Sequence, residues 1–81
     1  MIKIIHRVNE ISQIKKIPYK YGLEIDIRSY KNQLILHHEP FKKGTSFKKW
    51  LKYYKHNFLI LNVKEEGLEN EILKMMKINK I

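Results

Sequence analysis

The stretch GLEIDIRSYKNQLILHHEP, residues 22–40, carries the clearest structural pattern in the chain. Apolar and charged side chains alternate strictly at its start: Leu23, Ile25 and Ile27 alternate with Glu24, Asp26 and Arg28. Such alternation predicts a strand with one buried face and one polar face. The KNQ sequence at 31–33 is typical of a turn, and the apolar run at 34–38 predicts a second strand. Residues 23–38 are therefore expected to form a β-hairpin.

The turn of this hairpin decides which histidine meets the acidic residues. A three-residue loop centred on Asn32 places Asp26 directly opposite His38. A two-residue loop at 31–32 places Asp26 opposite His37 instead, because a shift of one residue exchanges the two faces of a strand. The residues alone leave both registers open. In either register, one histidine meets the carboxylates.

Strand and helix patterns alternate along the rest of the chain. Residues 2–6 and 58–63 are short apolar runs, which are typical of buried strands. Isoleucines at every third position predict a short helix before Pro18, and apolar positions within 47–54 recur at helical spacing. Three helices are expected, with first residues near Asn9, near Thr45 or Ser46, and after Gly67. This alternation of strands and helices indicates βαβ units in an α/β fold.

Composition limits the chain to one small domain and excludes several classes of protein. Its 81 residues carry a net charge of +9, almost all of it from lysines spread along the whole sequence. We attribute this charge to composition and do not expect a nucleic-acid partner. The absence of cysteine excludes disulfides and thiolate metal sites. No apolar run approaches the roughly 18 residues of a membrane span, and the N-terminal run is too short for a signal peptide, so we expect a cytoplasmic protein.

Three motifs, taken in order, resemble the opening of a known enzyme family. They are IIHR at 4–7, the hairpin sequence quoted above, and LILNVK at 59–64. Their order and spacing are similar to the HRG, E-x-D-V, V-V-x-H-D and E-x-K motifs of the glycerophosphodiester phosphodiesterase family. That family shares its barrel type with the phosphatidylinositol-specific phospholipases C. The resemblance implies that residues 1–81 form a partial (βα)₈ TIM barrel of about three βα units, with the hairpin extending the second strand.

The resemblance also implies a role for each residue that matches a family motif. His38 directly precedes the acid Glu39, as in the family's H-D pair, and this match selects the three-residue loop. The implied site consists of the catalytic histidines His6 and His38, the phosphate-binding residues Arg7 and Lys64, and the metal-binding residues Glu24, Asp26 and, more weakly, Asn62. The implied cofactor is Mg²⁺ or Ca²⁺, since these cations prefer oxygen ligands. The implied substrate is a small phosphodiester such as a glycerophosphodiester.

Two positions depart from the family pattern, and the chain is short for the family's fold. Val8 replaces the glycine of HRG, and Asn62 stands where the family has a third carboxylate. A complete barrel needs roughly 200 residues or more, so we expect an incomplete barrel that is inactive alone. A second chain or self-association would then complete it.

A different class of function is also compatible with the sequence. The alternative is a small basic α/β module that contacts nucleic acid or another protein, and it requires lysines gathered on one face. The phosphodiesterase hypothesis instead requires that four side chains converge on one point: His6, Glu24, Asp26 and His38.

Overall fold

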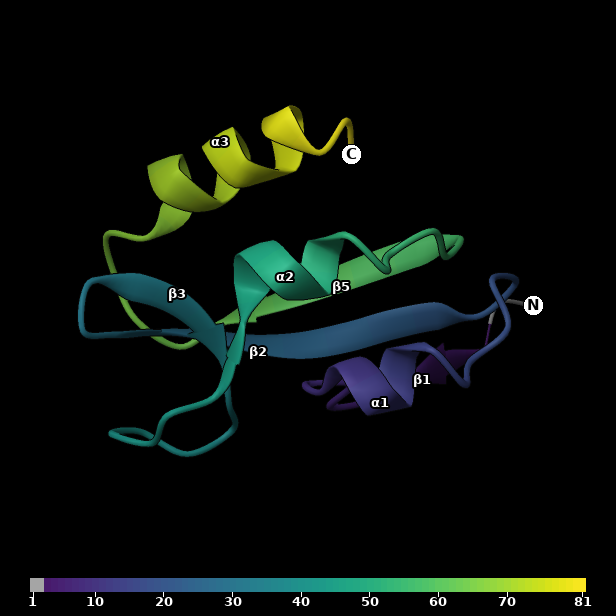
Figure 1. Cartoon of the computed structure of the whole chain (residues 1–81), viewed down its shortest axis with the longest axis horizontal. Helices are drawn as coiled ribbons and strands as arrows, with labels where there is room; N and C mark the ends of the chain where they lie inside the picture. The colour runs from purple at the N-terminus through teal and green to yellow at the C-terminus, as the bar shows by residue number, and fades with distance from the viewer. Residues whose placement is uncertain (1–2) are drawn as a thin grey trace.

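The fold is built on a single mixed sheet with helices packed on one face (Figure 1). The computed structural model describes residues 3–81. Within these residues the elements are, in chain order, β1 (Ile4–Ile5), α1 (Ile11–Ile14), β2 (Gly22–Tyr30), β3 (Gln33–Leu36), β4 (Thr45–Ser46), α2 (Phe47–Leu51), β5 (Phe58–Val63) and α3 (Glu69–Ile78). The predicted α/β class is therefore confirmed, and β5 has the predicted bounds.

The longest strand, β2, is the centre of the sheet. β1 and β5 pair with it in parallel, β3 pairs with it antiparallel, and β4 pairs with β3. β1 and β3 lie one after the other along the same edge of β2. The N–H of Gly22 donates to the Lys3 carbonyl, and the Asp26 carbonyl accepts from the His37 N–H. Residues an even number apart in a strand direct their main-chain groups to the same edge. Ile27, which points to the other edge, accepts a hydrogen bond from Lys64 after β5. The parallel strands thus lie in the order β1, β2, β5, and the sheet of residues 3–81 is open, not a closed barrel.

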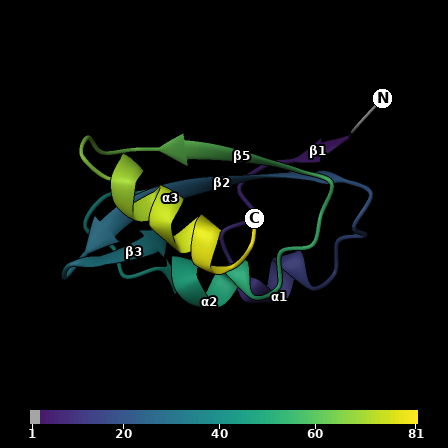
Figure 2. The same cartoon turned by 90° about the horizontal axis from the view of Figure 1, so that it is seen from above.

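The apolar residues of β2 determine which face of the sheet the helices cover. Leu23, Ile25 and Ile27 are fully buried beneath α1, α2 and α3, and Figure 2 shows all three helices on this side of the sheet. The core is completed by residues from the helices and loops: Val8, Ile14, Leu34, Leu36, Phe47, Trp50, Leu51 and Ile72. The opposite face carries the charged residues of β2, which alternate with the buried ones.

The hairpin register differs from the one selected by the family resemblance. Ile27 pairs with Leu36 and Tyr30 with Gln33, so the loop has two residues and the predicted three-residue loop is wrong. Lys31 and Asn32 have φ angles of 49° and 64°, as required by the tight type I′ turn that matches the twist of a hairpin. β3 also ends at Leu36, before the two histidines that were predicted to lie in it. Both histidines therefore belong to the loop that follows.

Two helix starts show how local hydrogen bonding sets the element boundaries. Ser46 caps α2 by accepting a hydrogen bond from the Lys49 amide at 3.3 Å, as one of the two predicted caps. The N-cap of α1 is Glu10, whose N–H donates a hydrogen bond to Gln13 Oε1 at 3.2 Å, as in a capping box. The predicted cap, Asn9, is wrong, because its side chain bonds to β2 instead.

None of the helices in residues 3–81 is both long enough and apolar enough to cross a membrane.

Candidate functional site

Charged residues from four parts of the chain meet on the open face of the sheet, at the carboxyl ends of β1 and β5. Glu24 and Asp26 lie on the same side of β2 because they are two residues apart. Three contacts join them to neighbouring segments: His6 Nδ1 lies 3.8 Å from Glu24 Oε1, His38 Nδ1 lies 3.7 Å from Asp26 Oδ2, and Lys64 Nζ forms an ion pair with Asp26 Oδ1 at 3.5 Å. The four side chains named by the phosphodiesterase hypothesis thus form two pairs, His6 with Glu24 and His38 with Asp26, on one face of β2.

The loop after β1 is fastened to Glu24. The main-chain N–H of Arg7 donates to Glu24 Oε1 at 2.8 Å, and the N–H of Val8 donates to the Glu24 carbonyl at 2.9 Å. Arg7 has a φ of 55°, so the chain turns sharply here without a glycine. Val8, which replaces the family's glycine, is buried in the core. The turn therefore fixes the strand end while the His6 side chain remains 73% exposed.

Asp26 is the buried centre of the site, with its side chain only 1% exposed. Its Oδ2 accepts a hydrogen bond from Asn9 Nδ2 at 3.0 Å, and its own N–H donates to Asn9 Oδ1 at 2.9 Å. Burial raises the pKa of Asp26, but the Asn9 hydrogen bond and the charges of Lys64 and His38 outweigh burial and hold that pKa below its usual value. Asp26 is therefore ionised at neutral pH, although it is buried.

His38 reaches Asp26 from the loop after β3, and Arg28 holds this loop in place. The Arg28 guanidinium donates to the carbonyl of His37 at 3.2 Å and to that of His38 at 2.8 Å. The His37 ring is turned back on its own loop, where its Nδ1 accepts the Glu39 N–H at 3.0 Å. The register is the one that pairs His37 with β2, but of the two histidines it is His38 whose ring approaches a carboxylate, with Nδ1 3.7 Å from Asp26 Oδ2.

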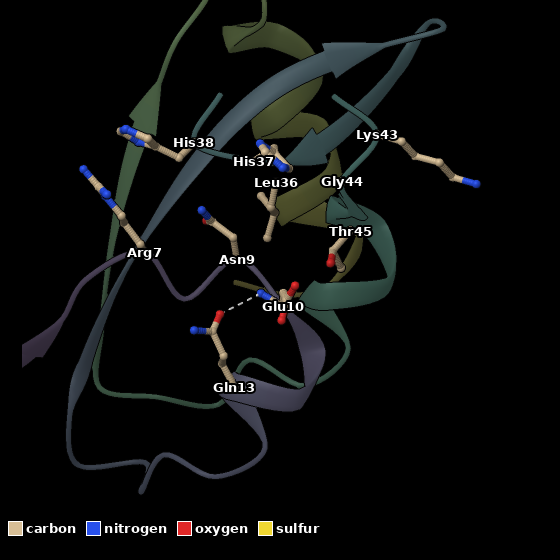
Figure 3. A pocket seen from close by; sticks show the side chains of 10 residues that line it. All are labelled: Arg7, Asn9, Glu10, Gln13, Leu36, His37, His38, Lys43, Gly44 and Thr45. Atoms are coloured by element: carbon tan, nitrogen blue, oxygen red, sulfur yellow. Dashed lines mark hydrogen bonds between the residues drawn. The ribbon is translucent and has the colours of Figure 1, made fainter. Parts of the chain in front are cut away.

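A surface pocket of about 640 Å³ opens between the loops that follow β1 and β3 (Figure 3). Arg7 and Asn9 line one side of it, and His37 and His38 line another. Figure 3 shows the Arg7 and His38 side chains extending toward the same side of the pocket. Glu24 and Asp26 do not line the pocket themselves, but Arg7 and Asn9 bind them directly. A ligand in this pocket would therefore lie beside the charged cluster.

The carboxylates can be tested as ligands for a divalent cation. Asp26 Oδ1 is buried without a hydrogen bond and lies 3.5 Å from Lys64 Nζ, so a cation could bind this oxygen only if the Lys64 ammonium moved aside. Asn62 is the register partner of Asp26 on β5 and offers an amide oxygen on the same face. Within residues 3–81 no three His, Asp or Glu side chains form a metal-binding group. Mg²⁺ often uses only one or two protein carboxylates and completes its shell with water and phosphate oxygens. Glu24 and Asp26 are the two carboxylates on this face that could serve such an ion.

Two supporting residues were missed by the sequence analysis. Asn9 was interpreted as a helix cap, and Arg28 as an ordinary polar residue of an alternating strand. Their partners lie 17 and 10 residues away in the sequence, so no local pattern identifies them. The only available signal was that Arg28 shares the polar face of Glu24 and Asp26.

Comparison with protein-family models, with curated proteins and with solved structures finds no match to this chain. The family resemblance seen in the motifs therefore stays a prediction, and the geometry of the site carries the functional argument.

Proposed function

We propose that the charged cluster is a metal-assisted phosphodiester hydrolysis site of the glycerophosphodiester phosphodiesterase type. The observation that supports this most directly is the convergence of two exposed histidines on two recessed carboxylates, His6 on Glu24 and His38 on Asp26. The histidine side chains are 73% and 44% exposed, while the carboxylates are 15% and 1% exposed. A substrate can therefore reach the imidazoles, and the acids remain in place behind them.

In the proposed reaction, the two histidines move the protons of hydrolysis. His6 takes a proton from the attacking water as its oxygen bonds to phosphorus, and His38 gives a proton to the leaving alcohol as its P–O bond breaks. Arg7 binds the phosphate oxygens with its guanidinium, and Lys64 neutralises charge beside Asp26. A divalent cation bound at Glu24 and Asp26 would polarise the phosphate and acidify the water.

We further propose that β1, β2 and β5 represent an arc of a (βα)₈ barrel. Successive parallel strands lie side by side, a helix follows β1 and β5, and α2 lies between the hairpin and β5. The helices cover the face that would be the outside of a barrel, and the charged cluster lies at the carboxyl ends of parallel strands on the inner face. In residues 3–81 the outer edge of β5 is unpaired, so a second chain or another copy pairing there would enclose the site further.

The proposal predicts hydrolysis of the chromogenic diester bis(p-nitrophenyl) phosphate in the presence of Mg²⁺, assayed at a high protein concentration that favours association. His38→Ala should lower the rate about 100-fold or more, because a positioned acid typically contributes that much. The matched control is His37→Ala, which removes a neighbouring imidazole that touches no carboxylate and should retain most of the rate. Equal rates in the two variants, or full turnover in excess chelator, would overturn the mechanism.

A further inference from the structure

Six lysines that are scattered along the sequence lie together around β3, β4 and α2. Three surface hollows of about 550, 520 and 240 Å³ occupy this region, and their walls include one carboxylate, Glu71. The lysines that line them, named here the lysine band, are Lys31, Lys43, Lys48, Lys49, Lys52 and Lys74. The fold thus gathers positive charge that the sequence distributes.

The three hollows adjoin one another, because neighbouring hollows share lining residues. Ser46 and Lys49 line both the first and the second, and Lys48 and Met75 line both the second and the third. The first two hollows lie on opposite faces of β3, since Ile35 lines one and its neighbour Leu34 lines the other. The lysine band therefore passes around the edge of the hairpin and continues to α3.

The six positive charges of the lysine band share the walls of the three hollows with one carboxylate, that of Glu71. All six lysines are exposed, and none forms an ion pair within residues 3–81. The carboxylates Glu24 and Asp26 are paired at the charged cluster instead. Exposed lysines that are close together and lack acidic partners create a positive potential, which attracts polyanions.

We propose that the lysine band binds single-stranded nucleic acid. A flexible chain of phosphates can follow hollows that pass around a strand edge, whereas a flat membrane surface or a rigid duplex cannot touch both faces of β3. Tyr30 lines the first hollow and is partly exposed, and the Lys31 ammonium lies 5.5 Å from the centroid of its ring. A base can stack on the other side of this ring. This inference does not depend on hydrolysis at the charged cluster, because none of the six lysines is a catalytic, phosphate-binding or metal-binding residue of that site. Of the six, Lys43 also lines the pocket beside the cluster.

The proposal is tested by fluorescence anisotropy with a labelled oligothymidylate and the full chain. If all six lysines contact phosphates, the logarithm of affinity falls with the logarithm of salt concentration with a slope near −4, from about −0.7 per contact. The triple variant Lys48→Gln, Lys49→Gln, Lys52→Gln, which changes the central hollow, should bind at least tenfold more weakly. The charge-matched control Lys16→Gln, Lys20→Gln, Lys55→Gln changes lysines that line none of the three hollows and should bind within about threefold of wild type.

Each outcome of this comparison bears on the proposal. An equal loss in both triple variants would show attraction by net charge alone and would overturn it. Tighter binding to anionic phospholipid vesicles than to the oligonucleotide, abolished by the first triple variant, would assign the lysine band to a membrane. Circular dichroism of both variants should match that of wild type, which is the check that they are folded. His38→Ala should bind the oligonucleotide as tightly as wild type. A failure of the nucleic-acid proposal can therefore be distinguished from a failure of the proposed hydrolysis.

Discussion

Asp26 shows most clearly how a single residue links folding to the site. Its carboxylate is buried, yet three groups from different segments make the charged form the stable one: Asn9, His38 and Lys64. A buried charge without such partners would be costly. Asp26 Oδ1 makes no hydrogen bond, but Lys64 Nζ lies 3.5 Å from it, so a bound cation would have to displace the Lys64 ammonium from this oxygen.

The stability of the protein should therefore depend on pH through Asp26. Its folded-state pKa lies below the ordinary value of 3.8, so the ionised carboxylate stabilises the fold at pH values above that value. This contribution is lost as the pH falls through the folded-state pKa. We expect the free energy of unfolding of wild type, relative to Asp26→Asn, to decline steadily below about pH 5. Urea denaturation at several pH values measures it, and a difference that stays constant or grows in acid contradicts the assignment.

At the residue scale, the motifs identified the two histidine–carboxylate pairs but not the residues that hold them in place. His6, Glu24, Asp26 and His38 were identified because they belong to motifs. Asn9 and Arg28 were not, because their roles arise only when the chain folds back on β2. Likewise, the carboxylate of Glu65, which follows β5, accepts hydrogen bonds from the N–H and the hydroxyl of Ser29. The local sequence does not predict this contact.

At the scale of elements, the hairpin shows the limit of pattern analysis. Alternation correctly predicted the buried face of β2, and the apolar run at 58–63 correctly predicted β5. The register could not be predicted, since both candidate loops placed a histidine opposite the carboxylates. The structure has the two-residue loop, in which Lys31 and Asn32 adopt left-handed conformations. His38 still reaches Asp26 because β3 ends before the histidines.

This turn makes a direct prediction for stability. Lysine is disfavoured at a positive φ, whereas asparagine tolerates it and is common in type I′ turns. Lys31→Asn should therefore stabilise the protein by about 0.5 kcal/mol, measured by thermal or urea unfolding. Lys42→Asn makes the same change of charge at a residue outside the positive-φ positions and should be close to neutral. A loss of stability in Lys31→Asn would argue against the two-residue turn.

At the scale of the whole molecule, the two faces of the sheet differ in the side chains they carry and in what covers them. One face is covered by helices and forms the core, while the other carries the charged cluster and remains uncovered in residues 3–81. Phe58 and Ile60 of β5 are 46% and 37% exposed, which leaves apolar surface next to the cluster. The α/β class was predictable from the alternation of elements. The gathering of lysines around α2 was not, because it depends on how β3, β4 and α3 meet.

The charged cluster and the lysine band consist of different residues, so one NMR experiment can show at which of the two a phosphodiester binds. We would titrate isotope-labelled protein with dimethyl phosphate in the presence of Mg²⁺ and follow every backbone amide by NMR. The account predicts that the largest shifts occur at Val8, Glu24, Asp26 and Lys64, and that Asp26→Asn abolishes them. Shifts confined to the lysines of α2, or shifts that persist in Asp26→Asn, would contradict the claim that the charged cluster is a phosphodiester site.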